Sequence, residues 1–494
     1  MTDRNIDANV ERRAAGARRG GALALIGLSA VLAGCAVGPN YRKPDTPVAQ
    51  NFAGTEAGPY SSGDAQARFW TQFDDQTLER LEADALDANH DLRIALGHLV
   101  EARAERRQAQ FDLAPTVTAS GGYTRERFSQ VQSPTGAPYD AHLYDAGFDA
   151  FWELDFFGRV RRSVEAQSAE VQGAEASLRD AQVSVTAEVA RTYFELRGQQ
   201  AQLAVARNNV DNERETLELT QARLEGGSGT ELDTSRAQSQ LSATLATIGP
   251  LEAAVARSIH RLSVLTGREP NALGALLGTA RALPDLPRVT AVGDPAGLLR
   301  RRPDIRVAER QLAASNALVG VAIGDLFPKV TFTGSFSYSA PGTGSLGDAS
   351  SRGYVVGPGI SWAAFDFGRV QAQVAGSRAR ADVALAAYER SVLRALEETE
   401  DALVTHARTR QSLKDATDSA QASLTAARLA RTRYEGGLVD FLVVLDAERT
   451  ELAAEDRLAQ ARTDAATSLI AVYKSLGGGW ETAPLPRYVR QAGG

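Results

Sequence analysis

Cysteine, methionine and histidine are scarce in this sequence. Its 494 residues include a single cysteine, Cys35, one methionine and five histidines. One cysteine can form neither an internal disulfide nor a thiolate metal cluster. The histidines never occur at the His-x-x-x-His or His-Glu-x-x-His spacing that places two metal ligands on one helix face. We therefore expect no metal site, no cofactor and no enzymatic activity.

Basic residues are not in excess either. Lys and Arg number 54 against 61 Asp and Glu, which gives a net charge of -7. This balance predicts no nucleic-acid partner. Hydrophobic residues make up 43% of the chain, enough for a sizeable core at this length.

The apolar run near the amino terminus, residues 21–33, follows a segment that contains five arginines. It is shorter than the ~20 residues that cross a bilayer as a helix, so the sequence predicts a signal peptide over residues 1–34. The run ends in Leu32-Ala33-Gly34-Cys35, which resembles the lipobox of bacterial lipoproteins. The resemblance implies lipidation of Cys35, and Ala36 after it implies transport to the outer membrane. A buried, inert thiol is the alternative. The Pro- and Gly-containing residues 35–68 are interpreted as a lipidated tether.

The sequence repeats itself. Gly-Arg-Val at residues 158–160 recurs at 368–370, and Glu-Gly-Gly at 225–227 recurs at 435–437, both with an offset of 210 (368 minus 158). Upstream, Asp91 pairs with Asp304 at an offset of 213, so we expect the loop between to be about three residues shorter in the second half. We assign residues 69–280 to a first repeat, 281–477 to a second and 478–494 to a C-terminal tail.

Four segments alternate apolar and polar residues with the period of two that is typical of strands. They cover about residues 116–124, 144–156, 329–339 and 354–365. Four carboxylates share one face of the second segment, with Phe151 as an apolar exception, so we expect this face to be wet: Asp145, Asp149, Glu153 and Asp155. A soluble sandwich also shows alternation, but strands of about ten residues with an apolar outer face match membrane barrels better. Lipid does not tolerate open sheet edges, so four strands predict closure by several chains.

The remaining sequence is predicted to be helical. Long helices are expected over residues 158–224, 231–266, 368–434 and 440–476, paired into two antiparallel hairpins by the Gly-Gly turns. We expect Gly249-Pro250 to interrupt the second of them, because proline removes a backbone donor. Narrow leucine seams on these helices indicate burial against further helices. The sequence thus predicts a mainly α protein with a transmembrane β part, built from two tandem repeats of a β-hairpin and long antiparallel helices.

These features together carry a family resemblance. The lipobox followed by Val-Gly-Pro-Asn-Tyr at 37–41, the two repeats and Arg-Tyr-Glu-Gly-Gly at 433–437 resemble a TolC-type outer-membrane efflux factor of the lipoprotein (NodT-like) branch. The resemblance implies a homotrimer with a 12-stranded β-barrel continuous with a periplasmic α-helical barrel, anchored in outer-membrane lipid with a long periplasmic extension. It also implies a passive channel that exports small molecules, with a periplasmic adaptor protein and an inner-membrane pump as partners.

The resemblance places functional residues at the two hairpin tips. Adaptor docking would involve Arg223, Gly226, Gly227, Asp233, Arg433, Tyr434, Gly436 and Gly437. Asp446 would contribute to a charged ring at the periplasmic constriction, whereas Val443 stands where the family has a second acid. The alternatives are that the glycines only reverse the chain and that Asp446 lies on a solvated helix face. A rival function is a non-conducting coiled-coil lipoprotein that tethers envelope layers, but it would not need the alternating strands.

Overall fold

The computed structural model describes residues 36–63 and 67–480. The predicted signal peptide, Cys35 and residues 481–494 of the tail lie outside the described residues. The described residues form two compact units. One contains the residues up to Pro44, Val100–Gly173 and Ala308–Tyr388, and the other contains Asp45–Leu99, Ala174–Val307 and the residues from Glu389 onward. Among the described residues, no helix is both long and apolar enough to cross a membrane.

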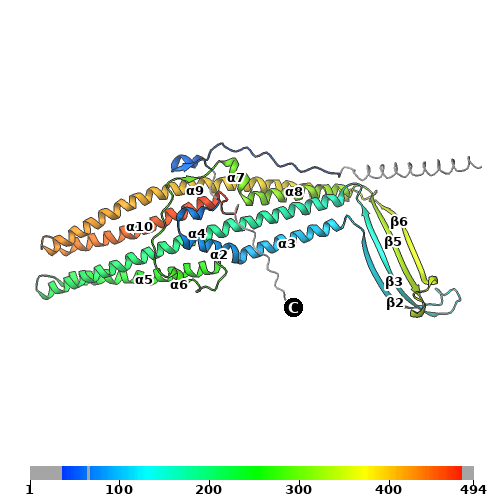
Figure 1. Cartoon of the computed structure of the whole chain (residues 1–494), viewed down its shortest axis with the longest axis horizontal. Coiled ribbons are helices and arrows are strands. Elements are labelled where there is room, and N and C mark those ends of the chain that lie inside the picture. Colours follow the sequence, from blue (N-terminus) through cyan, green and yellow to red (C-terminus); the bar gives the residue numbers. More distant parts are fainter. Residues whose placement is uncertain (1–35, 64–66, 481–494) are drawn as a thin grey trace, which may run out of the picture. The chain divides into compact units, whose positions relative to one another are not determined.

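The first unit contains a four-stranded antiparallel sheet (Figure 1). Its strands are β2 (Thr116–Phe128), β3 (Tyr139–Leu154), β5 (Lys329–Ala340) and β6 (Arg352–Ser361). Their order in the sheet is β2-β3-β5-β6, so each repeat supplies one hairpin and β3 pairs with β5 across the repeat boundary. The two sheet edges are therefore β2 and β6.

The register separates the side chains as the alternation predicts. Val117 pairs with Ala150, Ala150 with Gly334 and Gly334 with Val356, which defines a mostly apolar face. On the same face lie large exposed side chains: Tyr123, Phe148, Phe332, Phe336, Tyr354 and Ile360. The opposite face is mostly polar and carries Thr118, Ser120, Asp145, Asp149, Thr333, Ser335 and Ser337. Phe151 is the expected apolar exception, and Leu143 and Val355 are two further ones.

The predicted strand ends needed correction. β3 ends at Leu154 rather than at residue 156, because the Asp155 carboxylate turns to accept hydrogen bonds from the backbone N–H of Val160 (3.1 Å) and Arg161 (2.9 Å). Gly158 then takes a left-handed φ of 80°, which a helix interior does not allow, so the helix starts at Arg159. β6 ends at Ser361, not at residue 365, because its partner strand begins opposite, at Lys329.

The shorter spacing of the second repeat lies in its strands rather than in the loop. β2 and β3 contain 13 and 16 residues, whereas β5 and β6 contain 12 and 10. The connection of β5 to β6 spans residues 341–351 and contains two short 3-10 turns, η3 (Thr343–Ser345) and η4 (Ala349–Ser351). It is not shorter than residues 129–138 between β2 and β3.

Two helical hairpins repeat each other in length. α4 (Arg159–Glu225) and α9 (Arg369–Glu435) each contain 67 residues, and their returning partners α5 (Glu231–Leu265) and α10 (Phe441–Ser475) each contain 35. The predicted break at Gly249-Pro250 was wrong, since α5 runs through Pro250. Residues 249 and 250 are exposed, so water can hydrate the carbonyl that loses its donor.

Shorter elements flank the hairpins. The chain also contains η1 (Ala53–Ala57), η2 (Phe69–Phe73), α2 (Gln76–Ala88), α3 (His90–Phe111), α6 (Gly274–Leu277), α7 (Pro295–Arg301), α8 (Pro303–Gly324) and the parallel pair β1 (Tyr60–Ser61) and β4 (Thr290–Ala291). α3 and α8 are repeat equivalents of 22 residues each, 213 positions apart. Asn89 before α3 donates to the carbonyl of Leu265, and Arg302 before α8 donates to that of Ser475, both at 2.9 Å. Each repeat thus fastens its returning helix in the same way.

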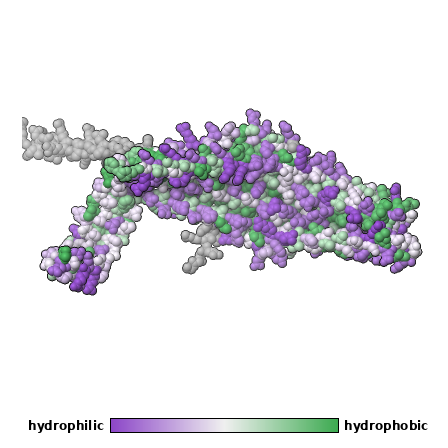
Figure 2. Space-filling model, turned by 180° about the vertical axis from the view of Figure 1, so that it is seen from behind, coloured by the Kyte–Doolittle hydropathy of each residue, from purple (hydrophilic) through white to green (hydrophobic). Residues whose placement is uncertain are grey.

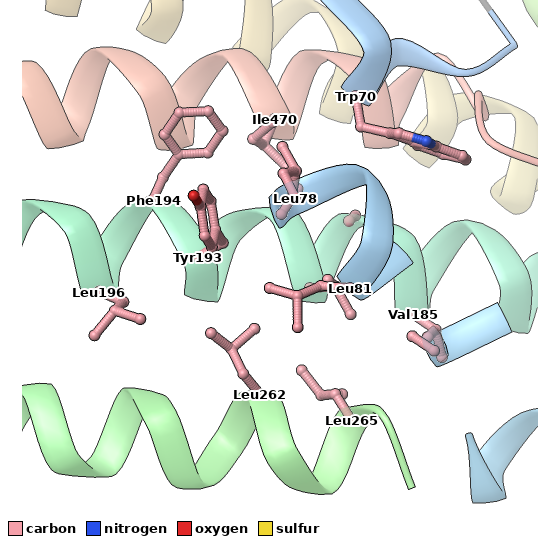
Figure 3. Packing of buried hydrophobic residues seen from close by; sticks show 14 of the residues in the cluster. Trp70, Leu78, Leu81, Val185, Tyr193, Phe194, Leu196, Leu262, Leu265 and Ile470 are labelled. Carbon is pink, nitrogen blue, oxygen red and sulfur yellow. The ribbon is translucent and has the colours of Figure 1, made fainter. Parts of the chain in front are cut away.

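The main core lies in the second unit, between α2, α4, α5 and α10 (Figure 3). Leu78, Leu81, Tyr193, Phe194 and Leu262 are fully buried there. Val189 and Leu196 of the predicted seam belong to this cluster, and Leu217 packs against a second cluster near the tips, whereas Leu224 is exposed. This core fixes the bases of both hairpins, whose distal tips carry the predicted site residues.

Candidate functional site

The first hairpin tip turns through Gly226 and Gly227. The Gly226 N–H donates to the Ala222 carbonyl at 2.9 Å, and Gly227, with a φ of 76°, donates to Leu224 at 3.0 Å. These bonds satisfy carbonyls that the end of α4 would leave open. Thr230 begins α5 by accepting from the Asp233 N–H at 3.3 Å and donating to the Asp233 carboxylate at 2.7 Å.

The second tip repeats this geometry. Gly436 donates to Thr432 at 3.2 Å, and Gly437, with a φ of 72°, donates to Tyr434 at 2.9 Å. A side chain added at either Gly227 or Gly437 would point into open space. The glycines therefore reverse the chain, and they leave the outer surface of both tips without a side chain at these positions.

Arg223 of the first repeat contacts Tyr434 of the second at the tips, next to an apolar cluster that also contains residues of both repeats, among them Ala237 and Phe441. Arg223 at the end of α4 donates to the Tyr434 carbonyl at 2.8 Å, and its guanidinium carbon lies 4.0 Å from the centre of the Tyr434 ring. Tyr434 is only 6% exposed and packs on Phe441 with ring centres 5.7 Å apart. Arg433, which is the repeat equivalent of Arg223 and precedes Tyr434 in the sequence, is exposed. Of the predicted tip residues, Arg223 and Tyr434 thus lie in the internal contact, and Arg433 and the glycines lie on the surface.

Apolar side chains remain exposed at both tips. Leu438 is 78% exposed in the turn of the second hairpin, and Leu224, Leu232, Leu442 and Val443 are also exposed. Figure 2 shows apolar residues gathered at the end of the helical hairpins. Exposed apolar patches of this kind mark surfaces that another protein covers.

Asp446 lies on α10, one turn beyond Val443, and is exposed. Its carboxylate makes no hydrogen bond or ion pair with any residue that the structure describes. Asp446 therefore lies on a solvent-accessible helix face, which fits both the predicted ring and the alternative of a solvated helix face. Val443, 48% exposed, occupies the neighbouring turn without a charge.

Behind the tips lies an acidic ladder that the sequence interpretation missed. Glu448 is 8% exposed and accepts hydrogen bonds from Arg431 of α9 at 2.7 Å and from Thr216 of α4 at 3.1 Å. Glu451 and Glu455 follow on the same face of α10, and Asn209 of α4 donates to Glu455 at 3.2 Å. Burial, then the charge of Glu455, raises the pKa of Glu451 to about 7, against the opposing effect of Arg431. Acids at positions 448, 451 and 455 share one helix face, which was the available signal.

Glu213 of α4 adds a further buried acid beside this ladder. Gln240 and Thr244 of α5 donate to its Oε1 at 3.0 and 2.9 Å, whereas Oε2 is buried without a partner among the described residues. Burial raises the pKa of Glu213, although the two hydrogen bonds act against this. No group of three or more acids, histidines or cysteines in the described chain could hold a metal ion.

A second cluster holds the segment that follows Cys35. Arg162, in the first turns of α4, is 3% exposed and donates to the carbonyls of Val37 (3.1 Å) and Gly38 (3.2 Å) and to the Asn40 side chain (2.8 Å). The Val37 N–H donates to the Phe157 carbonyl at 3.0 Å. Residues 37–40 of the predicted tether are therefore held between the residues that follow β3 and the first turns of α4.

Glycines make this arrangement possible. Gly38 has a φ of 92°, and a Cβ atom there would lie 2.6 Å from the Cα of Gly320 in α8. A Cβ on Gly158 would lie 2.5 Å from Ala36. Further along, the Tyr41 hydroxyl donates to Glu309 at 2.5 Å, and burial raises the pKa of Tyr41. We call residues 36–41 with Arg162, Gly158 and Gly320 the N-terminal cradle.

Comparisons with known proteins agree with this architecture. The family model described as "Outer membrane efflux protein" matches residues 81–268 and 295–478. The chain is 32% identical over 458 residues to the "Probable efflux pump outer membrane protein TtgC" of Pseudomonas putida, with 91% of this chain and 94% of the relative covered. It is 31% identical to "Nodulation protein T" of Rhizobium leguminosarum bv. trifolii, with 92% and 96% covered.

A solved structure is also similar. The outer-membrane channel OprN superposes with a TM-score of 0.84 at 43% identity and covers 90% of this chain and all of its own. The chain belongs to the outer membrane efflux protein family. The resemblance drawn from the motifs and the predicted fold class are thereby confirmed, and the chain is a channel protein of the outer membrane.

Proposed function

We propose that the chain is one protomer of a homotrimeric channel that exports small molecules across the outer membrane in a tripartite efflux system. The observation that carries this function is the combination of one amphipathic four-stranded sheet with two 67-residue helices in a member of this family. The efflux pump name of the Pseudomonas putida relative supports the transport role. The channel would be passive, without a catalytic step and without a cofactor.

The sheet supplies the membrane part of the proposal. Its apolar face, with exposed Phe148, Phe336 and Ile360, suits lipid, and its serine-, threonine- and aspartate-bearing face suits a water-filled lumen. Four strands from each of three chains would close a twelve-stranded barrel, so that no backbone group faces lipid unpaired. Closure is why the proposed function needs the homotrimer.

The hairpin tips supply the partner contact. We assign adaptor docking to the exposed Gly226, Gly227, Arg433, Gly436, Gly437 and the apolar Leu438 of the tips, together with the half-buried Asp233. The inner-membrane pump would supply the energy through that adaptor. Asp446 would form a ring of three carboxylates around the threefold axis, which attracts cations and repels anions.

Lipidation of Cys35 completes the proposal. The cradle holds Ala36, which directly follows Cys35 in the sequence, against the start of α4. Several acyl chains, at ~0.8 kcal/mol per buried CH₂, give a stable anchor.

Planar bilayer recordings with the purified trimer test the channel. We expect ion conductance whose preference for cations falls when Asp446 is replaced by alanine, because the ring of carboxylates that attracts cations is removed. Native mass measurement must first show three chains per particle. Trimeric protein that stays silent, also with Asp446→Ala, would favour the non-conducting tether instead.

A further inference from the structure

The three arginines of the four-stranded sheet lie on its apolar face. Arg125 and Arg127 belong to β2, and Arg352 belongs to β6. Because side chains alternate along a strand, Arg125 and Arg127 share the face of Val117, and Arg352 shares the face of Ile360. The polar face carries four acids and one lysine instead: Glu126, Asp145, Asp149, Glu153 and Lys329. The strands thus separate their arginines from most of their acids by face.

All three arginines also lie at one end of the sheet, the end away from α3 and α8 (Figure 1). Tyrosines stand directly before them on the same face, because Tyr123 is two residues from Arg125 and Tyr354 is two residues from Arg352. The ring of Tyr123 lies 4.7 Å, centre to centre, from that of Tyr144 on β3. In membrane sheets such aromatic rows mark the boundary between hydrocarbon and headgroups. The arginines follow directly beyond this boundary.

The length of β3 agrees with this position. Trp152 lies on the apolar face at the helical end of β3, and His142, which pairs with Arg125, is ten residues away. Ten residues of an antiparallel strand extend about 34 Å, and a tilt of about 35–45° reduces this to roughly 24–28 Å across a membrane, close to the ~25 Å of an apolar band. In the proposed channel the helices are periplasmic, so Arg125 lies at the level of the outer-leaflet headgroups.

The arginines carry positive charge that the strands do not neutralise. The Asp140 carboxylate accepts a hydrogen bond from Arg125 at 2.9 Å and lies 3.5 Å from Arg127, so two arginines share one acid. Their side chains are 62% and 72% exposed. Arg352 is also exposed, and it makes no ion pair with any residue that the structure describes. With His142 neutral, three arginines and one aspartate leave a surplus of two positive charges on this face of the strands.

We propose that Arg125, Arg127 and Arg352 bind the phosphate groups of a lipid headgroup in the outer leaflet of the outer membrane. This inference rests on the proposed function, which turns the apolar face toward lipid and closes the barrel with β6 of one copy beside β2 of the next. Arg352 of one copy then lies at the edge that carries Arg125 and Arg127 of its neighbour. The trimer has three such sites.

The chemistry of the side chains favours phosphate. A guanidinium group donates two parallel N–H bonds to neighbouring phosphate oxygens and keeps its charge at physiological pH. The location favours a lipid over free phosphate, because a lipid places its phosphate at this depth while its acyl chains cover the exposed Phe336 and Tyr354 of the same face. The tyrosine hydroxyls beside the arginines can donate to the same headgroup.

Native mass spectrometry of the full trimer with added lipid tests the site. The probe is lipid A, a glycolipid that carries two phosphates, added to delipidated trimer in detergent. We expect wild type to bind up to three copies, and Arg125→Gln/Arg127→Gln/Arg352→Gln to bind them about ten times more weakly. Arg103→Gln/Arg107→Gln/Arg378→Gln is the matched control, because it removes three exposed arginines from helices of the same unit, and it should keep the affinity of wild type.

A single substitution covers the case in which the triple variant does not assemble. Arg352→Gln removes a side chain without an ion pair in the described chain, and it should weaken lipid A binding about threefold. Lipid A without its phosphates should bind wild type about as weakly as intact lipid A binds the triple variant. Inorganic phosphate at millimolar concentration should not displace bound lipid A.

Each outcome of these measurements decides a point. Unchanged affinity in the arginine variants, or equal binding of the lipid without phosphates, would overturn the inference, because the acyl chains alone would then hold the lipid. Displacement by inorganic phosphate would overturn the lipid assignment in favour of a site for free anions. Monomers by native mass in wild type would contradict the proposed function itself, whereas trimers without a preference for phosphate contradict only this inference.

Discussion

Arg223 of the first repeat lies across the ring of Tyr434 of the second, with 4.0 Å between guanidinium carbon and ring centre, and donates to the Tyr434 carbonyl at 2.8 Å. The two residues close the ends of α4 and α9. Their relatives by the repeat, Arg433 and Leu224, make no such pair, because Arg433 is exposed. Of these two equivalent arginines, Arg223 is therefore the one that contacts the other repeat in the part of the chain that the structure describes.

Replacing Arg223 by alanine should loosen the tips. The charged hydrogen bond and the cation-π contact together contribute about 1–2 kcal/mol. We expect a higher open probability in single-channel recordings of the purified trimer. Arg433→Ala is the matched control, since it removes the same charge at the equivalent position of the other repeat. Equal effects of both substitutions would mean that the tip charge, and not the contact with Tyr434, controls opening.

Glu451 should make the distal helices sensitive to pH. Its pKa of about 7 in the folded chain lies above the usual 4.5, so folding favours the protonated form. The carboxyl therefore stabilises least above pH 7, and stability increases as the pH falls from about 7 toward 4.5. The groups that face Glu451 are Glu455 and Glu448 on α10 and Arg431 on α9.

Glu451→Gln tests this dependence, because the amide cannot ionise. We expect the wild type to lose more thermal stability than Glu451→Gln between pH 5.5 and pH 8, measured as Tm by differential scanning calorimetry. Glu218→Gln, at an exposed position of α4, serves as the control and should follow the wild type. A parallel change of Tm with pH in wild type and Glu451→Gln would contradict the assignment.

Glu82 should limit stability at neutral and higher pH. It is fully buried in α2, and neither carboxylate oxygen has a partner among the described residues. Burial raises the pKa of Glu82 well above its usual range, so the side chain stays protonated or carries a heavy penalty. Glu82→Leu should raise the free energy of unfolding by about 1–3 kcal/mol, and the gain should shrink toward pH 5. Asp87→Leu, exposed on the same helix, should give no comparable gain in denaturant titrations.

The cradle predicts that Gly38 tolerates no side chain. Its φ of 92° and the 2.6 Å approach of a Cβ to Gly320 mean that Gly38→Val must expel residues 36–41. The guanidinium of Arg162 would then lose its partners at Val37, Gly38 and Asn40, at about 1–3 kcal/mol for each group left unsatisfied. We expect limited proteolysis to cut the tether of Gly38→Val at least ten times faster than in wild type. Gly63→Ala, where a Cβ meets only ordinary contacts at 3.7 Å, should remain protected.

Much of this architecture could be predicted because each sequence pattern, such as a Gly-Gly turn or an alternating strand, occurs in both repeats. The lengths of α4 and α9 follow from the spacing of Gly158 to Gly226 and of Gly368 to Gly436, which are local turn signals with a physical cause. The wet and dry faces of the strands follow from their period. The prediction of a break at Pro250 was wrong because helix propensity describes the local sequence only. A proline inside a helix costs about 3 kcal/mol, and α5 nevertheless runs through Pro250 because the rest of this 35-residue helix is packed.

The contacts between distant segments could not be predicted from local patterns. Arg162 stands 122 positions from Asn40, and nothing near it distinguishes it from the other arginines of α4. The acidic ladder required knowing that α4, α9 and α10 approach each other at Glu448. Tyr434 was assigned to the tip surface from its motif, whereas its burial depends on Phe441 across the turn.

In the proposed homotrimer the barrel would close by pairing β6 of one copy with β2 of the next, as β3 pairs with β5 inside the chain. This seam offers a position for a stabilising substitution. Inside the chain, Phe157 stacks on Phe327 with ring centres 4.7 Å apart. The repeat equivalents at the proposed seam are Phe367, fully exposed in the single chain, and Ala114 of the next copy. Ala114→Phe should recreate the stack three times in the trimer, at about 0.5–1.5 kcal/mol each. We expect the trimer to dissociate at a higher temperature in semi-native gels. Ala114→Phe combined with Phe367→Ala should lose this gain, and a gain that persists would show that the new ring packs elsewhere.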